Sequence, residues 1–179
     1  MNILQKRNID KHLSAWKMRK RDEIIDIPQL QTAKNICIFA SCQNYKQWKN
    51  LSNEISEWQK TANCTFQVFC YINQHLKRDF SQANEHLFHK KHVSFWGAID
   101  KEAKEILQNK SYDILLLFNI SDNRLLYYFQ SFVNAQFRIG NNNDFIDYTD
   151  FVITVNTENT FSTFMQQTEK YLSLLMSNK

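Results

Sequence analysis

The sequence predicts an α/β domain of Rossmann-like type, with a mainly parallel sheet between two layers of helices, preceded by a basic N-terminal helical arm. Short apolar segments of strand length alternate with segments in which apolar residues recur every three or four positions, the spacing of one helix face. The segment 112–119 (YDILLLFN) contains five consecutive large apolar residues, so both of its faces must be covered. Strands that alternate with helices in this way are typical of three-layer folds with a parallel sheet.

Charge divides the chain of 179 residues into an arm and a body. The first 21 residues carry seven Lys or Arg side chains and one acidic side chain, a net charge of +6, whereas the other 158 residues have a net charge of −2. Pro28 restricts the residue before it to extended conformations, so the helix of the arm is expected to end before this point. We therefore expect a basic helical arm and linker at 1–28 and a single domain at 29–179, which is a usual domain size.

The body is expected to begin with two strands separated by a helix. Residues 35–40 (NICIFA) and 65–72 (TFQVFCYI) are apolar runs of buried-strand length. Between them, residues 44–60 form a helix whose apolar face is marked by Tyr45, Trp48, Leu51, Ile55 and Trp58. Residues 73–92 are polar and irregular, which predicts a loop.

The second half of the body repeats this alternation. A short strand at 93–96 is expected to lead into a helix with Ile99, Ala103, Ile106 and Leu107 on its inner side. The strand at 112–119 precedes a helix built on Leu125, Leu126, Phe129, Phe132 and Val133. Strands at 135–140 and 150–156 and a closing helix after residue 157 complete the domain. Six residues of these strands are expected to be buried: Ile36, Ile38, Val68, Leu115, Leu117 and Ile153.

Two resemblances to known families accompany this pattern. Residues 112–141 (YDILLLFNISDNRLLYYFQSFVNAQFRIGN) resemble the N-terminal half-domain of heptosyltransferase-like glycosyltransferases, in which a Tyr-Asp strand leads through a helix to a Gly-Ala-x-x-Arg-Ile-Gly segment. The whole chain, with its basic leader and a closing helix after DFVITVN (150–156), is similar to a bacterial single-domain family of unknown function. The second resemblance implies a fold and no activity.

The glycosyltransferase resemblance does not extend to the catalytic position. In that superfamily the turn after the first strand carries a Gly-Asp pair, whose carboxylate acts as the base on the acceptor hydroxyl. Residues 40–45 (ASCQNY) contain neither residue. The donor also binds a second Rossmann domain, for which this chain has no room, so we expect no working transferase.

Composition and motifs exclude several classes of function. The two glycines, Gly97 and Gly140, are far apart, so the chain has no G-x-G-x-x-G or Walker A loop. Residues 41–44 (SCQN) would place side chains where a pyrophosphate approaches the backbone, and we expect no cofactor and no binding of NAD, FAD or ATP. No segment approaches the roughly 20 apolar residues of a membrane span, and the N-terminus lacks the apolar core of a signal peptide. The prediction is a cytoplasmic protein without a transmembrane segment.

The ends of the predicted strands contain a candidate ligand crevice, because doubly wound folds usually bind ligands beyond the carboxyl ends of their strands. Cys42 lies there, just before a helix whose N-terminus would lower the pKa of its thiol. No base can be assigned to it, so we expect no catalytic residue. The candidate crevice residues are Ser41, Cys42, Asn119, Ser121 and Asp122. Ser121 or Asp122 is also placed to cap the next helix.

The histidines and cysteines do not have the spacing of a metal site. His86, His89 and His92 recur every three residues, and on a helix such side chains would spread over about 120°, too wide for one ion. The neighbouring Lys90 and Lys91 also oppose a cation. No two cysteines form a Cys-x-x-Cys pair, so we expect free thiols and no metal.

A polar stretch follows the strand at 135–140. Arg138 and the run 141–144 (NNND) have the chemistry to meet an anionic ligand. Asparagines also tolerate the left-handed conformations of turns, so we favour a turn without a ligand here.

The arm is the strongest anomaly of the sequence. Ile9, Leu13 and Trp16 define one narrow apolar face, and three functional interpretations compete: docking on the body, binding of a nucleic acid backbone, and attachment to an anionic membrane surface. The alternative to these is that the basic residues only form a solvated face, as most charge runs do. We expect the arm to contribute little to folding stability but much of any affinity for polyanions, with a log-log salt slope of about −3 to −4. The candidate polyanion-binding residues are Lys6, Arg7, Lys11, Lys17, Arg19, Lys20 and Arg21.

These observations favour a non-enzymatic cytoplasmic binding or accessory module. Its basic arm would contact RNA, a ribonucleoprotein or a membrane surface, and a protein partner is a further candidate. The alternative is a small-ligand Rossmann enzyme or a degenerate glycosyltransferase-like half-domain.

Overall fold

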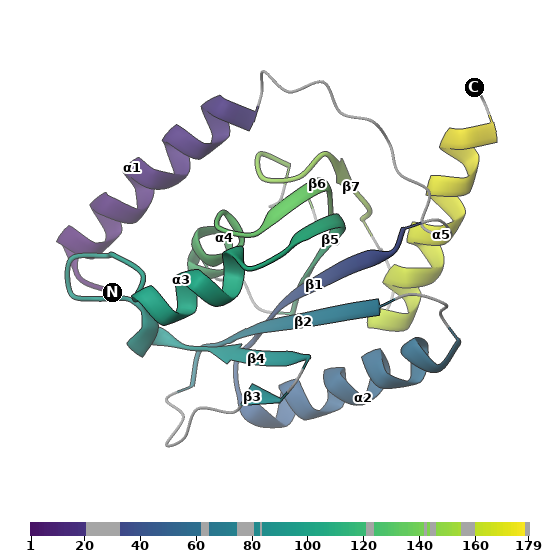
Figure 1. The fold of residues 1–179 in the computed structure, drawn as a ribbon, viewed down its shortest axis with the longest axis horizontal. Helices are drawn as coiled ribbons and strands as arrows, with labels where there is room; N and C mark the ends of the chain where they lie inside the picture. Colours follow the sequence, from purple (N-terminus) through teal and green to yellow (C-terminus); the bar gives the residue numbers. More distant parts are fainter. Residues whose placement is uncertain are drawn as a thin grey trace.

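The computed structural model describes residues 1–20, 33–61, 65–74, 81–82, 84–120, 124–141, 143, 146–154 and 160–177. Within them a seven-stranded sheet lies between two layers of helices (Figure 1). The helices are α1 (Ile3–Lys20), α2 (Tyr45–Thr61), α3 (Lys101–Gln108), α4 (Arg124–Gln130) and α5 (Phe161–Ser177), with a short 3-10 helix η1 (Lys90–His92). The strands are β1 (Asn35–Cys42), β2 (Thr65–Ile72), β3 (Ser81–Gln82), β4 (Glu85–Phe88), β5 (Ser111–Asn119), β6 (Asn134–Gly140) and β7 (Phe151–Val152).

The strands follow the order β3-β4-β2-β1-β5-β6-β7. All neighbouring pairs are parallel except β3 and β4, which are antiparallel. Without β3, the order runs outward from β1 through β2 to β4 on one side and through β5 to β7 on the other, as in doubly wound Rossmann folds. The predicted fold class is confirmed, and the strand order reverses between β1 and β5.

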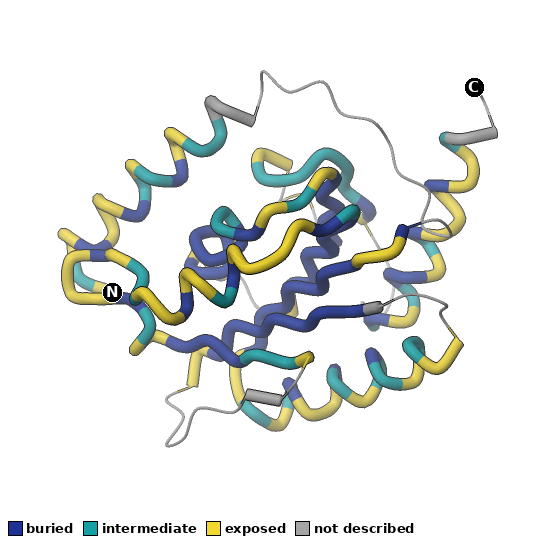
Figure 2. Tube along the Cα trace, in the orientation of Figure 1, coloured by how far each residue is buried: buried dark blue, intermediate teal, exposed yellow. Residues whose placement is uncertain are grey.

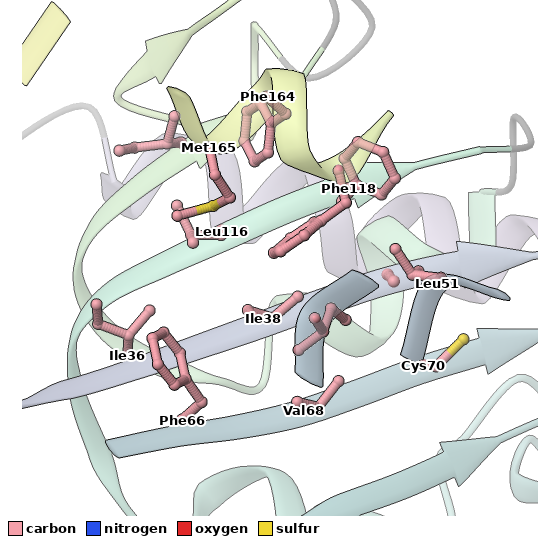
Figure 3. Packing of buried hydrophobic residues seen from close by; sticks show 14 of the residues in the cluster. Ile36, Ile38, Leu51, Phe66, Val68, Cys70, Leu116, Phe118, Phe164 and Met165 are labelled. Atoms are coloured by element: carbon pink, nitrogen blue, oxygen red, sulfur yellow. The ribbon is translucent and has the colours of Figure 1, made fainter. Parts of the chain in front are cut away.

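Both faces of the sheet are covered. Ile36 and Ile38 of β1 point into a core beneath α2 and α5, part of which is drawn in Figure 3. Cys37 and Phe39, which alternate with them, point into a second core beneath α1, α3 and α4. The six strand residues expected to be buried are all at most 3% exposed, because every strand interior touches one of these two cores.

Three segments differ from the prediction. Residues 81–82 and 85–88, within the segment expected to be loop, form β3 and β4, and Leu87 of β4 pairs with Cys70 of β2. Residues 93–96 do not form a strand: they lie in a tight loop in which Val93 bridges Ile99 in antiparallel fashion. The strand expected at 150–156 is reduced to the two residues of β7, and 155–159 lie outside the described residues.

The arm is docked on the body. Ile9 and Leu13 of α1 are 0% and 2% exposed and belong to the core beneath α3 and α4. Asp10 forms an ion pair with Arg124 of α4, and the ring of His12 stacks on Phe132 at 4.8 Å. Docking of the apolar face, one of the three interpretations of the arm, is therefore what the structure shows. Pro28 and the rest of the linker lie outside the described residues.

The described helices include none with the length and apolar character that crossing a bilayer requires.

Candidate functional site

The carboxyl ends of β1 and β5 meet where the strand order reverses, which is the usual ligand position of this fold. Ser41 of β1 donates a hydrogen bond from Oγ to Oδ1 of Asn119 of β5. The main-chain N–H of Asn119 donates to Oδ1 of Asn141 at 2.9 Å, and Nδ2 of Asn141 donates to the carbonyl of Asn119 at 3.1 Å. All three residues are at most 4% exposed. We refer to Ser41, Asn119 and Asn141 as the strand-end cluster; these polar groups hydrogen-bond to one another, as buried polar groups must.

Two of the predicted crevice residues, Ser41 and Asn119, are thus brought together, but inside the protein. Cys42 is also fully buried, beneath α2 and α5. Ser121 and Asp122 lie outside the described residues. Of the described residues of the predicted crevice, Ser41 and Asn119 thus bond to each other across β1 and β5.

The described cysteines, Cys37, Cys42 and Cys70, are free and buried. Burial raises the pKa of the Cys70 thiol, and the neighbouring Cys42 raises it further. Burial also raises the pKa of Cys37. A nucleophilic cysteine needs the opposite shift, so neither thiol is prepared for catalysis. Cys64 lies outside the described residues.

The residues after β6 do not behave as a turn alone. Asn141 is 1% exposed and joins β6 to the end of β5, and no described residue other than Gly97 has a positive φ. Asn141 therefore does not adopt the left-handed backbone conformation that would have made it an ordinary turn residue. Arg138 is buried as well, and its guanidinium donates to the carbonyls of Ala135 at 2.9 Å and Val133 at 2.8 Å. Sequence reasoning missed Asn141 as a member of the cluster.

The histidines shape the segment that follows β4. Nδ1 of His89 accepts a hydrogen bond from the N–H of Lys91, and Nδ1 of His92 accepts one from the N–H of His89, so the two side chains cap η1. His86 lies beside the ring of Phe69, and burial lowers its pKa. Across the described ranges, no three His, Cys, Asp or Glu side chains gather as a metal site.

The basic residues of α1 divide into two groups. Lys6, Arg7 and Lys11 are exposed, and Figure 2 shows exposed stretches of α1 in yellow between buried and half-buried ones. Lys17 is engaged with the body: its Nζ lies 2.6 Å from Oδ2 of Asp147 and 4.3 Å from the ring centroid of Tyr148. Burial alone would lower the pKa of Lys17, but hydrogen bonds to these two residues raise it overall.

The structure does not describe the side chains of the other predicted polyanion-binding residues. Arg19 and Lys20 belong to the end of α1, where side chains are not described, and Arg21 lies outside the described residues. We refer to Lys6, Arg7 and Lys11 as the basic face. None of the ion pairs formed within the described residues involves these three side chains.

An apolar surface beside the basic face was missed by sequence reasoning. Phe95 and Trp96, in the loop that follows η1, are each 63% exposed, and Ile3 and Leu4 in the first turn of α1 are 86% and 45% exposed. The loop passes around the beginning of α1 (Figure 1). We refer to Ile3, Leu4, Phe95 and Trp96 as the apolar tip. The adjacent Phe-Trp-Gly residues, 95–97, were the only signal in the sequence, because Gly97 is one of two glycines.

Comparison with known proteins places the chain in a family. A model of a family of unknown function, DUF6913, matches residues 2–175, and the chain belongs to this family. The predicted resemblance to a single-domain family of unknown function is thereby confirmed in its general form. No curated protein and no solved structure matches the chain. None of these findings supports the local resemblance of residues 112–141 to glycosyltransferases.

Proposed function

We propose that this member of the DUF6913 family is a non-enzymatic, cytoplasmic binding module that contacts an anionic macromolecular surface through the basic face of α1. One observation carries the proposal. Ile9 and Leu13 anchor α1 in the core, while Lys6, Arg7 and Lys11 of the same helix remain exposed. Anchoring fixes the direction in which these cations point, so an anionic partner would meet them without first ordering the helix.

The position of these cations is unfavourable for the helix itself. Asn2 caps the N-terminus of α1 by accepting a hydrogen bond from the N–H of Gln5 at 2.7 Å, and the first turn contains no acidic residue. Lys6 and Arg7 follow directly, near the positive end of the helix dipole. Arg7 and Lys11 are like charges four residues apart, an arrangement that costs about 0.2–0.5 kcal/mol. An anionic partner would relieve both penalties.

The enzymatic alternative rests on the strand order, which is that of many ligand-binding Rossmann domains. A small-ligand enzyme or a degenerate glycosyltransferase half-domain would use the carboxyl ends of β1 and β5. There the side chains of Ser41 and Asn119 are hydrogen-bonded to each other and buried. This arrangement favours the binding module.

The test compares two triple variants with the same change in net charge. Lys6→Gln/Arg7→Gln/Lys11→Gln removes the basic face, and Lys46→Gln/Lys49→Gln/Lys170→Gln removes three exposed lysines from α2 and α5 on the other side of the sheet. The measurement is the salt concentration at which each protein elutes from immobilised heparin, a general polyanion. We expect the first variant to elute at clearly lower salt than the second, because only it loses the cations of the basic face. Equal elution of the two variants would refute the proposal.

A further inference from the structure

Ile3 and Leu4 of the apolar tip precede Lys6 and Arg7 by three residues, about one turn of α1, and hydrogen bonds from Asn2 and Asn8 hold the loop of Phe95 and Trp96 against the same end of the helix. The apolar tip and the basic face together have the chemistry of a membrane-interface site. We propose that the apolar tip inserts into the headgroup region of an anionic lipid bilayer while the basic face contacts the lipid phosphates. This inference rests on the proposed function, since it names the anionic surface that the basic face recognises. Large exposed apolar side chains that gather in one place mark interaction surfaces rather than ordinary solvent-exposed surface.

The tip is held in a defined conformation. Nδ2 of Asn2 donates to the carbonyl of Phe95 at 3.2 Å, and Nδ2 of Asn8 donates to the carbonyl of Trp96 at 2.7 Å. Nε2 of Gln5 donates to the carbonyl of Ser94 at 2.9 Å. The capping residue Asn2 and two side chains of α1, Gln5 and Asn8, thus bind three successive carbonyls of the loop. The main chain of the loop is therefore fastened to the beginning of α1, while the two aromatic residues stay largely exposed.

Gly97 completes this attachment. Its φ of +84° lies in the left-handed region, and a Cβ at this position would lie 2.9 Å from the carbonyl oxygen of Gln5. Its own carbonyl accepts a hydrogen bond from Oη of Tyr128 in α4 at 2.8 Å. The loop is therefore fixed to α1 on one side and to α4 on the other. Exposure of Phe95 and Trp96 is a consequence of this ordered turn.

The composition of the surface matches a bilayer interface. Trp and Phe with aliphatic residues on one side and Lys or Arg around them are typical of segments that lie in the headgroup region. Besides Lys6 and Arg7, two more exposed cations, Lys90 and Lys91, precede the loop in η1. Each basic residue held near an anionic leaflet adds to the attraction, and the apolar side chains add burial that does not depend on salt.

A single-stranded nucleic acid fits the tip less well. Nucleic acid bases stack on flat, accessible aromatic faces. The rings of Phe95 and Trp96 are nearly perpendicular, at 89° with centroids 5.4 Å apart, so they do not form a common platform. The exposed aliphatic side chains of Ile3 and Leu4 have no use in base stacking but bury readily in lipid. The observations therefore favour a lipid surface.

The experiment uses the full chain and co-sedimentation with vesicles of phosphatidylcholine containing about 30% phosphatidylserine, vesicles of phosphatidylcholine alone, and poly-uridine RNA as a separate arm. Phe95→Ser/Trp96→Ser removes the aromatic part of the tip. Ile146→Ser/Leu174→Ser removes two exposed apolar residues elsewhere and serves as the matched control. Circular dichroism and thermal melting verify that each variant is folded. Quenching of tryptophan fluorescence by brominated lipid reports insertion of Trp96.

We expect binding to the anionic vesicles, weak binding to phosphatidylcholine alone, and at least about a tenfold loss of vesicle affinity in Phe95→Ser/Trp96→Ser with little change in the control. Quenching by brominated lipid should disappear in the same variant. Unchanged vesicle binding of that variant would overturn the inference but leave the proposed function standing. Binding to poly-uridine without binding to vesicles would likewise overturn the inference and leave the proposed function standing. A full chain that binds neither probe would contradict both proposals.

Discussion

The strand-end cluster and the apolar tip are opposites in chemistry. The cluster consists of polar side chains that are buried and bonded to one another, at the position where a doubly wound fold usually exposes polar groups to a ligand. The tip consists of apolar side chains that are exposed, on a main chain whose carbonyls are bonded to α1. The comparison teaches that the polar groups described at the usual ligand position of this fold are bonded within the protein, whereas large apolar side chains are left exposed at the outer surface.

The largest expected effect concerns the docking of α1 on the core of the body. Leu13→Ala removes a buried side chain from the core beneath α1 and should lower the free energy of unfolding by about 2–5 kcal/mol. Leu4→Ala, on the exposed part of the same helix, should change it by less than about 0.5 kcal/mol. Chemical denaturation of both variants measures the difference. This prediction replaces the expectation from sequence that the arm contributes little to stability, and equal values for the two variants would restore that expectation.

The next effect concerns the strand-end cluster. Asn141→Ala deprives the main-chain N–H and carbonyl of Asn119 of their side-chain partner and should cost about 2–3 kcal/mol, because the groups left behind are buried. Asn143, whose Oδ1 accepts a hydrogen bond from Thr154 at the exposed surface, provides the control, and Asn143→Ala should cost less than about 1 kcal/mol. A mild effect of Asn141→Ala, measured by denaturation, would mean that the cluster is open to water and available to a ligand.

A smaller effect should follow from changing the turn that carries the tip. Gly97→Ala forces a side chain into the left-handed region and against the carbonyl of Gln5, and should cost about 1–3 kcal/mol. Ala98→Gly, at the exposed neighbouring position, serves as the control. Thermal melting and vesicle binding are measured on both. If Gly97→Ala melts like the unmodified protein and binds equally well, the tip does not depend on its ordered attachment to α1.

The sequence predicts the sheet and its helices well because hydrophobic periodicity is a local property. The bounds of β2 were predicted to the residue, and the buried face of α2 was identified from spacing alone. β4 was missed because only Leu87 and Phe88 of its four residues are buried, and its pairing with β2 is a tertiary effect.

The candidate sites were predicted less completely, for two physical reasons. Ser41 and Asn119 follow predicted strands, so their place at the strand ends was visible, but Asn141 joins them only because β6 lies next to β5. Phe95 and Trp96 were assigned to a short strand at 93–96, although aromatic residues can equally lie in an exposed turn. The positive φ of Gly97 instead closes a tight turn there, and the hydrogen bonds that hold this turn come from α1, about 90 residues away in the sequence.

Hydrogen–deuterium exchange of the full chain, with and without vesicles containing phosphatidylserine, tests the central claim most directly. The account predicts that vesicles slow exchange of the backbone amides at 2–11 and 93–99, where the basic face and the apolar tip lie. It also predicts unchanged exchange at Ser41, Asn119 and Asn141, whose polar groups are already bonded within the protein. Protection confined to the ends of β1, β5 and β6, with none at the tip, would contradict it.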